Sequence, residues 1–331
     1  MAIRHGSERE KLYLEVARCV GNTNLYEIKN IRVPNGCRVF CKEEYLNPTG
    51  SHYDRFWVDY LRREEDSGLI STSDTLIETS TGNSGASFAW ACRALGFMDY
   101  HVVIPEDMPY TRIRQIEELG AIIKCSPKGI YVDGLIATFI AYANEVEKNS
   151  NKRVFRTNHA IKGDISLASL GAIATEVIKK LSASNIKLDY FISALGNGLS
   201  TRGIGETLKQ KYPTIKIIGF EAEDSPTVYS KLNPEMIRPD TTGRTHGLLG
   251  TSPGGDPSRF PIMDGYSKHL FKVELVKEKE WTDAGIMLAN REGKLVGHTS
   301  SAAFFEAMKL AQGVSNKNIL IIFYDPSWKY F

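Results

Sequence analysis

Two short polar segments have the residue types and spacing expected of a site that performs chemistry. The first, residues 47–55, reads N-P-T-G-S-H-Y-D-R, and the second, residues 78–85, reads E-T-S-T-G-N-S-G. In the first segment Pro48 and Gly50 predict a turn, because proline fixes φ and glycine tolerates unusual φ values. Tyr53 follows this turn where a strand leads into a helix, a place where α/β folds put their chemistry. Taken alone, the turn is better explained as a plain connection.

The second segment and a third, residues 191–205, have the composition of anion-binding turns. The third reads F-I-S-A-L-G-N-G-L-S-T-R-G-I-G. Each follows a strand-like apolar run and leads into a predicted helix. Glycines allow the backbone to approach a ligand closely, and N–H groups at the positive end of a helix stabilise a phosphate or carboxylate. The alternative for each is a tight strand–helix turn without a ligand.

The elements expected around these segments alternate between strands and helices. Strands are expected near residues 38–42, 75–78, 100–104, 121–125, 153–156 and 189–193. Helices are expected at residues 54–64, 85–95, 109–119, 131–148 and 166–181. Such alternation predicts an α/β fold with mostly parallel sheets covered by helices on both faces.

The bulk composition excludes several classes of protein. Of the 331 residues 42% are hydrophobic and 24% charged, and the net charge of +2 predicts neither nucleic acid nor a membrane as partner. No run approaches the roughly 18 apolar residues of a membrane span, and residues 1–12 lack an apolar signal core. We therefore expect a cytoplasmic protein. Five cysteines without a C-x-x-C pair and seven histidines without an H-x-x-x-H pair predict buried free thiols and no metal site.

Together these segments resemble the cysteine synthase family of pyridoxal-phosphate (PLP) enzymes, which have the tryptophan-synthase-β-like fold type II. Residues 47–55 resemble the family's N-P-x-G-S-x-K-x-R segment, whose lysine forms the Schiff base with PLP. Residues 78–85 resemble its T-S-G-N-T-G substrate loop, residues 21–25 its G-N-T-P-L segment and residues 297–303 its G-I-S-S-G-A-A segment. The resemblance covers nearly the whole chain.

The resemblance implies an architecture and an assembly. We expect an N-terminal lobe at residues 1–150 and a C-terminal lobe at residues 151–331, with residues 1–40 packing on the C-terminal lobe. The cofactor cleft would lie between the lobes, and the C-terminal lobe would carry the phosphate-binding loop. Because members of the family are usually homodimers, a homodimer acting on a small amino-acid substrate is expected.

The resemblance also implies roles for individual residues. The phosphate cup of PLP would consist of Gly196, Asn197, Gly198, Leu199 and Ser200. The carboxylate of the substrate would lie on Ser80, Thr81, Gly82, Asn83 and Ser84, and the side chain of Asn83 would also bond the ring oxygen of PLP. Gly247, in the glycine-rich stretch 241–257, would face the substrate.

Three positions depart from the family pattern. Tyr53 stands where the family has its Schiff-base lysine, and a phenol cannot form an imine. The unperturbed tyrosine pKa of about 10 also makes it a poor base near neutrality. Leu199 replaces a glycine of the phosphate cup. Pro326 falls on the serine whose hydroxyl faces the pyridine nitrogen, and Ser327 beside it would substitute if the loop shifts.

Three interpretations of the function stay open. The first is a cysteine synthase-like enzyme for β-replacement or β-elimination on an activated serine-type amino acid, with Tyr53 an engineered change that removes the ordinary chemistry. The second is a natural pseudoenzyme that binds a ligand or a protein partner, and the third is a divergent enzyme with Tyr53 as acid or base. Pro326 and Leu199 favour natural divergence, because one engineered change does not explain them. We expect PLP to be held without a covalent link or to be absent, since Lys42 and Lys162 are poor substitutes for the missing amine.

Overall fold

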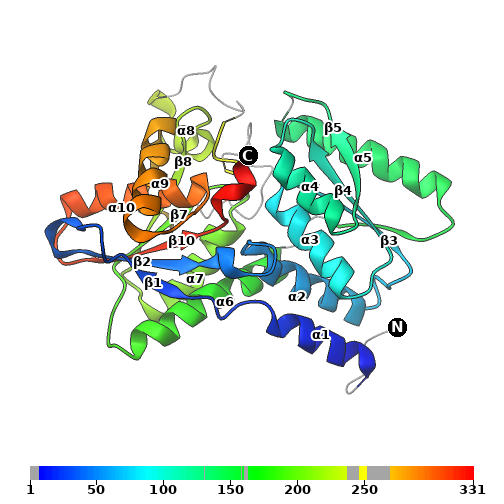
Figure 1. Cartoon of the computed structure of the whole chain (residues 1–331), viewed down its shortest axis with the longest axis horizontal. Helices are drawn as coiled ribbons and strands as arrows, with labels where there is room; N and C mark the ends of the chain where they lie inside the picture. Colours follow the sequence, from blue (N-terminus) through cyan, green and yellow to red (C-terminus); the bar gives the residue numbers. More distant parts are fainter. Residues whose placement is uncertain (1–6, 130, 158, 160–162, 237–245, 252–268) are drawn as a thin grey trace. The chain divides into compact units, whose positions relative to one another are not determined.

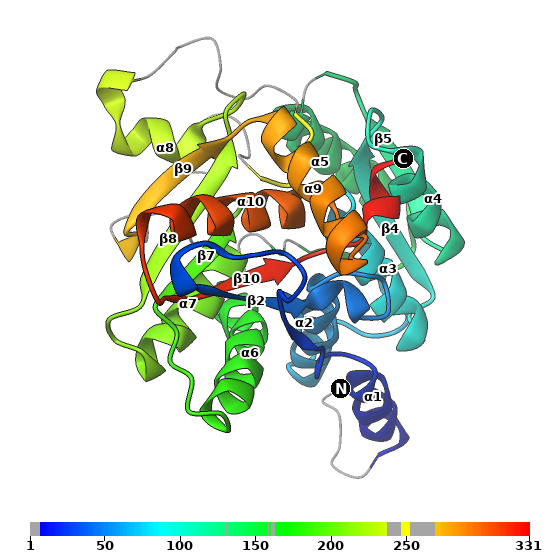
Figure 2. The same ribbon diagram turned by 60° about the vertical axis from the view of Figure 1, so that its left-hand side comes forward.

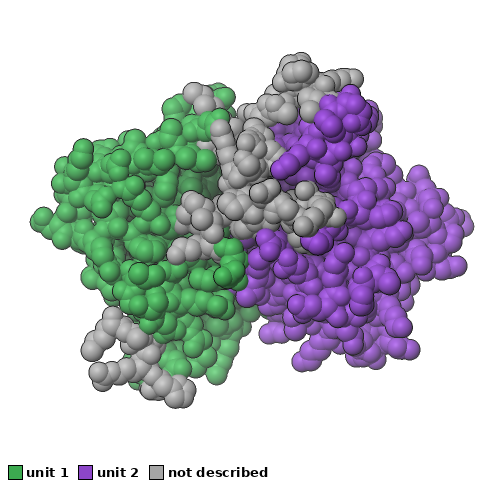
Figure 3. Space-filling view, turned by 180° about the vertical axis from the view of Figure 1, so that it is seen from behind, with its two compact units in different colours: residues 1–21, 47–165, 329–331 green, residues 22–46, 166–328 purple. Residues whose placement is uncertain are grey.

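The computed structural model describes residues 7–129, 131–157, 159, 163–236, 246–251 and 269–331. The chain divides into two compact units, which are described separately (Figure 3). Unit 1 comprises residues 1–21, 47–165 and 329–331, and unit 2 comprises residues 22–46 and 166–328. The two lobes expected at residues 1–150 and 151–331 stay a prediction.

Unit 1 contains a sheet of four parallel strands in the order β5-β4-β3-β6 (Figure 1). The strands are β3 (Thr75–Thr79), β4 (Asp99–Pro105), β5 (Ile122–Ser126) and β6 (Val154–Arg156). Its helices are α1 (Glu8–Arg18), α2 (Tyr53–Asp66), α3 (Asn83–Ala94), α4 (Tyr110–Glu118) and α5 (Tyr131–Asn149). Helix α5 packs on β3, β4 and β5, and α2 packs beside α3.

Unit 2 contains a sheet of six strands in the order β1-β2-β10-β7-β8-β9. The strands are β1 (Leu25–Glu27), β2 (Arg38–Glu43), β7 (Tyr190–Ala194), β8 (Lys216–Ala222), β9 (Lys272–Val276) and β10 (Asn318–Phe323). Only the β1–β2 pair of this sheet is antiparallel. The helices are α6 (Gly163–Ser182), α7 (Leu199–Lys211), α8 (Thr227–Leu232), α9 (Glu278–Glu292) and α10 (His298–Gly313). Short 3-10 helices are η1 (Pro34–Gly36), η2 (Glu44–Leu46), η3 (Pro234–Met236) and η6 (Ser327–Tyr330).

The central strand β10 shows that both faces of the unit 2 sheet are covered by apolar cores. Its residues 319–323 are fully buried, as expected for a parallel strand covered on both faces. Ile321 belongs to one apolar core with residues of α9 and α10, whereas Leu320 and Ile322 belong to another with residues of α6 and α7. Figures 1 and 2 show α9 and α10 on one side of β10 and α6 on the other. Successive side chains along the strand therefore belong to two separate apolar cores, one on each face of the sheet.

The α/β architecture predicted from the sequence is confirmed, with two mostly parallel sheets flanked by helices. The expected helix at residues 54–64 is α2, and the expected strand at residues 189–193 is β7 within one residue. The five cysteines are free thiols, but the predicted burial is wrong for Cys19 and Cys125, which are exposed. Among the helices of the described residues, none combines the length and apolar character needed to cross a bilayer. Within the same part of the chain, no group of three or more histidine, cysteine, aspartate or glutamate side chains is arranged to hold a metal ion.

Candidate functional site

The turn expected before Tyr53 is present and is fixed by a buried carboxylate. The amide of Gly50 donates to the carbonyl of Asn47 at 2.8 Å, and Gly50 has a φ of 75°, which glycine adopts without strain. The carboxylate of Asp54 accepts hydrogen bonds from the amide of Thr49 at 2.8 Å and from its hydroxyl at 2.6 Å. Asp54 is fully buried in the first turn of α2. The start of α2 is therefore anchored to the turn.

Tyr53 is the first residue of α2, and its ring lies among other rings. Its amide donates to the hydroxyl of Ser51 at 3.2 Å. The ring centroid lies 4.3 Å from that of His52 and 5.5 Å from that of His159, with the His159 ring at 79° to it. The start of α2 thus carries a half-buried phenol packed against two imidazoles.

A buried carboxylate holds His159. Glu78 lies in β3 and is fully buried. Its carboxylate accepts from the hydroxyl of Thr157 and lies 2.8 Å from Nδ1 of His159. No motif marked His159 in the sequence, because its partner is 81 residues away in the chain.

The predicted substrate loop is shaped by its own serines. The hydroxyl of Ser80 accepts hydrogen bonds from the amides of Gly82 at 2.9 Å and Gly85 at 2.7 Å. The hydroxyl of Ser84 accepts from the indole of Trp57 at 3.0 Å, which ties the loop to α2. The loop leads into α3, whose 12 residues begin at Asn83. Backbone N–H groups at such a helix N-terminus can bind a carboxylate.

The C-terminus of the chain supports this loop. Arg112 donates to the carbonyl of Thr81 and to the carbonyl of Lys329, both at 3.1 Å. At Gly82, which has a φ of 131°, an added Cβ would lie 2.5 Å from the Arg112 side chain. Substitution of this glycine would therefore displace the arginine as well as strain the backbone.

Lys329 holds the side chain of Asn83. Its ammonium group is fully buried and donates to Oδ1 of Asn83 at 3.0 Å. The positive charge of Lys329 also acts on Asp54, whose pKa is raised by burial despite the hydrogen bonds from Ser87 and Thr49. The hydrogen bond from Lys329 therefore fixes Oδ1 of Asn83 as an acceptor.

The predicted phosphate cup lies in unit 2 at the start of α7, a helix of 13 residues. Gly198 caps this helix with a φ of 87°, and no side chain caps its N-terminus. An added Cβ at Gly196 would lie 2.3 Å from the carbonyl oxygen of Gly250, so this position requires glycine. The side chain of Asn197 accepts from the amide of Leu199 at 3.1 Å, and the Leu199 side chain is fully buried in an apolar core. Leu199 thus departs from the family's glycine by pointing into the core.

The predicted cofactor residues Pro326 and Ser327 follow β10. Pro326 pairs with Val296 in a single bridge, and the amide of Ser327 donates to the carbonyl of Leu295 at 3.1 Å. Proline offers no side-chain hydrogen-bonding group for a pyridine nitrogen. Because β7 and β10 are neighbouring parallel strands, the cup and Pro326 both follow the carboxyl ends of adjacent strands.

Gly247 lies in a short described segment of unit 2. Its carbonyl lies 3.1 Å from Nδ1 of His298, and an added Cβ would lie 3.3 Å from the ring of Trp281. Most of the glycine-rich stretch 241–257 in which it was predicted lies outside the described residues.

Neither of the two other lysines considered supplies an available amine in the described part of the chain. Lys42 is fully buried, with its ammonium 2.7 Å from the carboxylate of Glu176 and 3.5 Å from that of Glu44. It also donates to the carbonyl of Thr23 at 2.8 Å. Lys162 lies outside the described residues.

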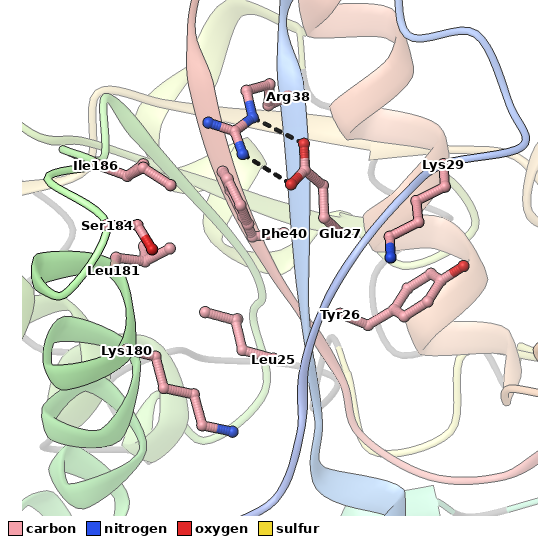
Figure 4. Close-up of a pocket in the computed structure, with 10 residues that line it drawn as sticks. All are labelled: Leu25, Tyr26, Glu27, Lys29, Arg38, Phe40, Lys180, Leu181, Ser184 and Ile186. Atoms are coloured by element: carbon pink, nitrogen blue, oxygen red, sulfur yellow. Dashed lines mark hydrogen bonds and ion pairs between the residues drawn. The ribbon is translucent and has the colours of Figure 1, made fainter.

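A separate groove of about 330 Å³ lies in unit 2 beside β1, β2 and α6 (Figure 4). Its guanidinium and carboxylate groups are already paired, because Arg38 donates twice to Glu27 at 2.7 Å. The ammonium of Lys180 donates to the carbonyl of Thr23. None of the residues predicted to bind cofactor or substrate lines this groove.

The structure therefore assembles the predicted site residues in two sets. Tyr53, the loop 80–84 and Asn83 lie together in unit 1, where α2 packs beside α3. The cup 196–200 and Pro326 lie together in unit 2. Two side-chain pairings were not predicted from the sequence: the hydrogen bond from Lys329 to Asn83 and the pairing of His159 with Glu78.

Comparisons with known proteins agree with this arrangement. Residues 16–325 match the family described as "Pyridoxal-phosphate dependent enzyme". Cysteine synthase B of Campylobacter jejuni is 27% identical, with 97% of each chain covered. A probable cysteine synthase of Bacillus subtilis is 28% identical over 94% of this chain and 93% of its own. A hydrogen sulfide-producing enzyme from Fusobacterium nucleatum superposes with a TM-score of 0.81 at 25% identity, covering 96% of this chain and 97% of the other.

The two helix-flanked, mostly parallel sheets are the architecture of fold type II PLP proteins. The chain belongs to the family of pyridoxal-phosphate dependent enzymes. Within that family the relatives it resembles are of the cysteine synthase type.

Proposed function

We propose that the chain is a cysteine synthase-like protein that binds PLP without a covalent link and acts on an activated serine-type amino acid by β-replacement or β-elimination. The observation that carries this proposal is Tyr53. It occupies the first position of α2, in the place of the family's lysine, and packs against His52 and His159. Such packing supports a natural residue at this position over an isolated engineered change.

The phosphate end of the predicted site fits PLP. Gly196 has no room for a side chain, and Gly198 begins a 13-residue helix without a side-chain cap. A backbone turn of this kind binds phosphate through its N–H groups and the positive end of the helix. The buried side chain of Leu199 leaves the backbone of the cup to do so.

The other end of the predicted site does not fit an imine. Tyr53 offers a phenol, Lys42 is held by Glu176 and Glu44, and Pro326 cannot donate to a pyridine nitrogen. No covalent step through the cofactor is therefore assigned to residue 53. Bound PLP supplies an electron sink for the α-carbon of an amino acid. The chain would hold the amino acid through the loop 80–84 and orient the ring through Asn83.

A second candidate function is ligand binding without turnover. It is favoured by the absence of an amine at residue 53, since an amine forms the imine and then acts as base in the resembled enzymes. Under either function we propose a homodimer in the cytoplasm with a small amino acid as ligand. The support for the homodimer, the location and the ligand is the similarity of the chain to cysteine synthases.

Replacing Tyr53 with lysine distinguishes these two candidate functions from an ordinary cysteine synthase-like enzyme in which Tyr53 is an engineered change. If the natural site is built for an imine, Tyr53→Lys will turn yellow with PLP and will convert O-acetylserine or O-phosphoserine with a sulfur nucleophile. Under our proposal the unchanged chain already converts this substrate, and the variant gains the chromophore without a large increase in β-replacement, because Pro326 remains. The matched control is Tyr53→Met, which has a flexible side chain but no amine.

The unchanged chain provides the complementary result. It should retain PLP in equilibrium dialysis and show no yellow chromophore that borohydride reduces. Such a chromophore in the unchanged chain would contradict the proposal.

A further inference from the structure

Helix α4 bonds both of the polar segments of unit 1 that the sequence singles out. The side-chain amide of Gln115 donates to the carbonyl of Thr49 at 3.0 Å. The guanidinium of Arg112 donates to the carbonyl of Thr81 at 3.1 Å. Because residues three apart lie on the same face of a helix, one face of α4 reaches both the turn before Tyr53 and the predicted substrate loop.

Ile116 adds an apolar contact on this face of α4. It is fully buried, and an added Cβ at Gly85 would lie 3.1 Å from its Cδ1 atom. The amide of Gly85 donates to the hydroxyl of Ser80 in the same loop. The missing side chain at position 85 therefore allows the loop and α4 to pack closely.

The C-terminal segment of the chain holds Arg112 in place. Nε of Arg112 donates to the carbonyl of Lys329 at 3.1 Å, and the guanidinium lies 4.6 Å from the ring centroid of Tyr330. The hydroxyl of Thr111 donates to the carbonyl of Phe331 at 2.7 Å. Arg112 is only 2% exposed, so its hydrogen bonds lie where an unmade one is costly.

The same two segments are also joined through α2. The indole of Trp57 donates to the hydroxyl of Ser84 at 3.0 Å, and the carboxylate of Asp54 accepts from the amide of Thr49 at 2.8 Å. Trp57 and Asp54 are fully buried. The hydrogen bonds thus form a closed circuit that runs from the turn to α2, to the loop, to α4 and back to the turn. Displacement of one segment is therefore transmitted to the other.

We propose that Gln115 and Arg112 are positioning residues that keep the turn 47–50 and the loop 80–84 in one fixed arrangement. Neither residue is assigned a contact with the substrate. This inference rests on the proposed function, in which the loop holds the carboxylate of the amino acid and Tyr53 follows the turn. A ligand on the loop is then coupled through α4 to the start of α2.

The first test is amide hydrogen exchange in the ligand-free protein, measured by mass spectrometry on peptides that cover residues 47–55 and 78–85. Gln115→Met removes the donor and keeps the length of the side chain. It should speed exchange in both peptides by about 10-fold, the factor by which one partly buried hydrogen bond shifts a local opening equilibrium. Gln115→Lys restores a donor and should return most of the protection. Faster exchange confined to residues 47–55 would overturn the inference, because the hydrogen bond of Gln115 goes to the turn.

Arg114→Gln is the matched control on α4, because Arg114 is exposed and pairs with Glu118 at 3.0 Å. It should leave exchange in both peptides at the wild-type rate. Exchange as fast as in Gln115→Met would overturn the inference, since any change on α4 would then loosen the two segments.

A double variant tests whether the two positioning residues act together. Arg112→Lys keeps the charge but loses the planar fork that reaches two carbonyls, so it should also speed exchange in both peptides. On a logarithmic scale, the effects of Arg112→Lys and Gln115→Met should add to less than their sum, because either change opens the circuit. Fully additive effects would show two independent contacts and would overturn the inference.

L-serine, added with PLP and compared with PLP alone, tests the consequence for ligand binding. In the wild type it should slow exchange at residues 78–85 and at residues 47–55, whereas in Gln115→Met it should slow exchange at 78–85 alone. Protection of 78–85 without protection of 47–55 in the wild type would overturn the coupling and leave the proposed function standing. Failure of L-serine to protect 78–85 in the wild type would contradict the proposed function, while exchange in the ligand-free variants would still decide the role of α4.

Discussion

Tyr53 decides what chemistry the site performs. In our proposal its phenol takes the place of the amine of the resembled enzymes, and its ring packs against His52 and His159. Of the two other lysines considered, Lys42 is buried against Glu176 and Glu44. The proposed function therefore assigns no imine to residue 53 or to Lys42.

The buried Lys329 leads to a testable prediction at the scale of residues. Its buried ammonium donates to Asn83, so Lys329→Met leaves the acceptor of Asn83 without its charged partner and removes a positive charge near Asp54. Loss of one partner of a buried hydrogen bond costs about 1–3 kcal/mol. We expect the free energy of unfolding, measured by urea titration, to fall by about this amount.

Lys329→Arg is the matched control, because it keeps the charge and the donors. It should retain most of the stability and of the PLP affinity. A Lys329→Met protein as stable as the wild type would show that this hydrogen bond contributes nothing.

The local turns around these residues could be predicted from the sequence, whereas the pairings could not. Proline, glycine and small hydroxyl residues determine the turns at 47–55 and 78–85 within a few positions. The bond between Lys329 and Asn83 joins residues 246 positions apart, and that between His159 and Glu78 spans 81 positions. Contacts between residues so far apart in the sequence depend on how the helices and strands pack, which a local sequence pattern does not indicate.

At the scale of elements, a buried carboxylate near the end of β8 accepts hydrogen bonds from the first turn of α8. Glu221 is fully buried and accepts from the amides of Val228 at 3.0 Å and Tyr229 at 2.9 Å. Burial raises the pKa of Glu221 to about 7, even though these backbone hydrogen bonds lower it. The carboxyl group is thus neutral in the folded chain at pH values where it would ionise in the unfolded chain.

This predicts a pH dependence of stability. Because the folded pKa is above the unfolded value, the contribution of Glu221 is complete below about pH 4.5 and is lost as the pH rises through about 7. Urea unfolding of wild type and Glu221→Gln should therefore differ in pH slope over this range. We expect the wild type to lose on the order of 2 kcal/mol more than the variant.

Glu306, whose pKa burial also raises to about 7, remains in both proteins and serves as an internal control. Equal pH slopes for the two proteins would contradict the role assigned to Glu221.

Elements were more predictable where the apolar pattern is long. The alternation of strands and helices predicted the parallel sheets, and the glycine turn predicted the start of α7. The three-residue strand β1 was missed, because so short a strand has no period to detect. The buried side chain of Leu199 also had no signal in the sequence, since it depends on the core formed by α6 and α7.

At the scale of the whole molecule, the chain has the fold of the PLP family, and our proposal is that it keeps the phosphate turn while the tethering residue has changed. Both sheets and the match over residues 16–325 follow the family. In the proposed function the departures at Tyr53 and Pro326 would concern the aldehyde and the ring nitrogen of PLP, whereas the glycines of the cup would hold its phosphate. Fold and cofactor chemistry can thus diverge separately within one family.

The most direct test of this account is the mass of the unchanged chain after incubation with PLP, borohydride reduction and denaturation. We predict that dialysis shows one bound PLP for each chain while the denatured chain keeps its unmodified mass. A single lysine carrying one equivalent of the reduced phosphopyridoxyl group would contradict the account, because it would reveal a tethering amine in place of the one that Tyr53 lacks.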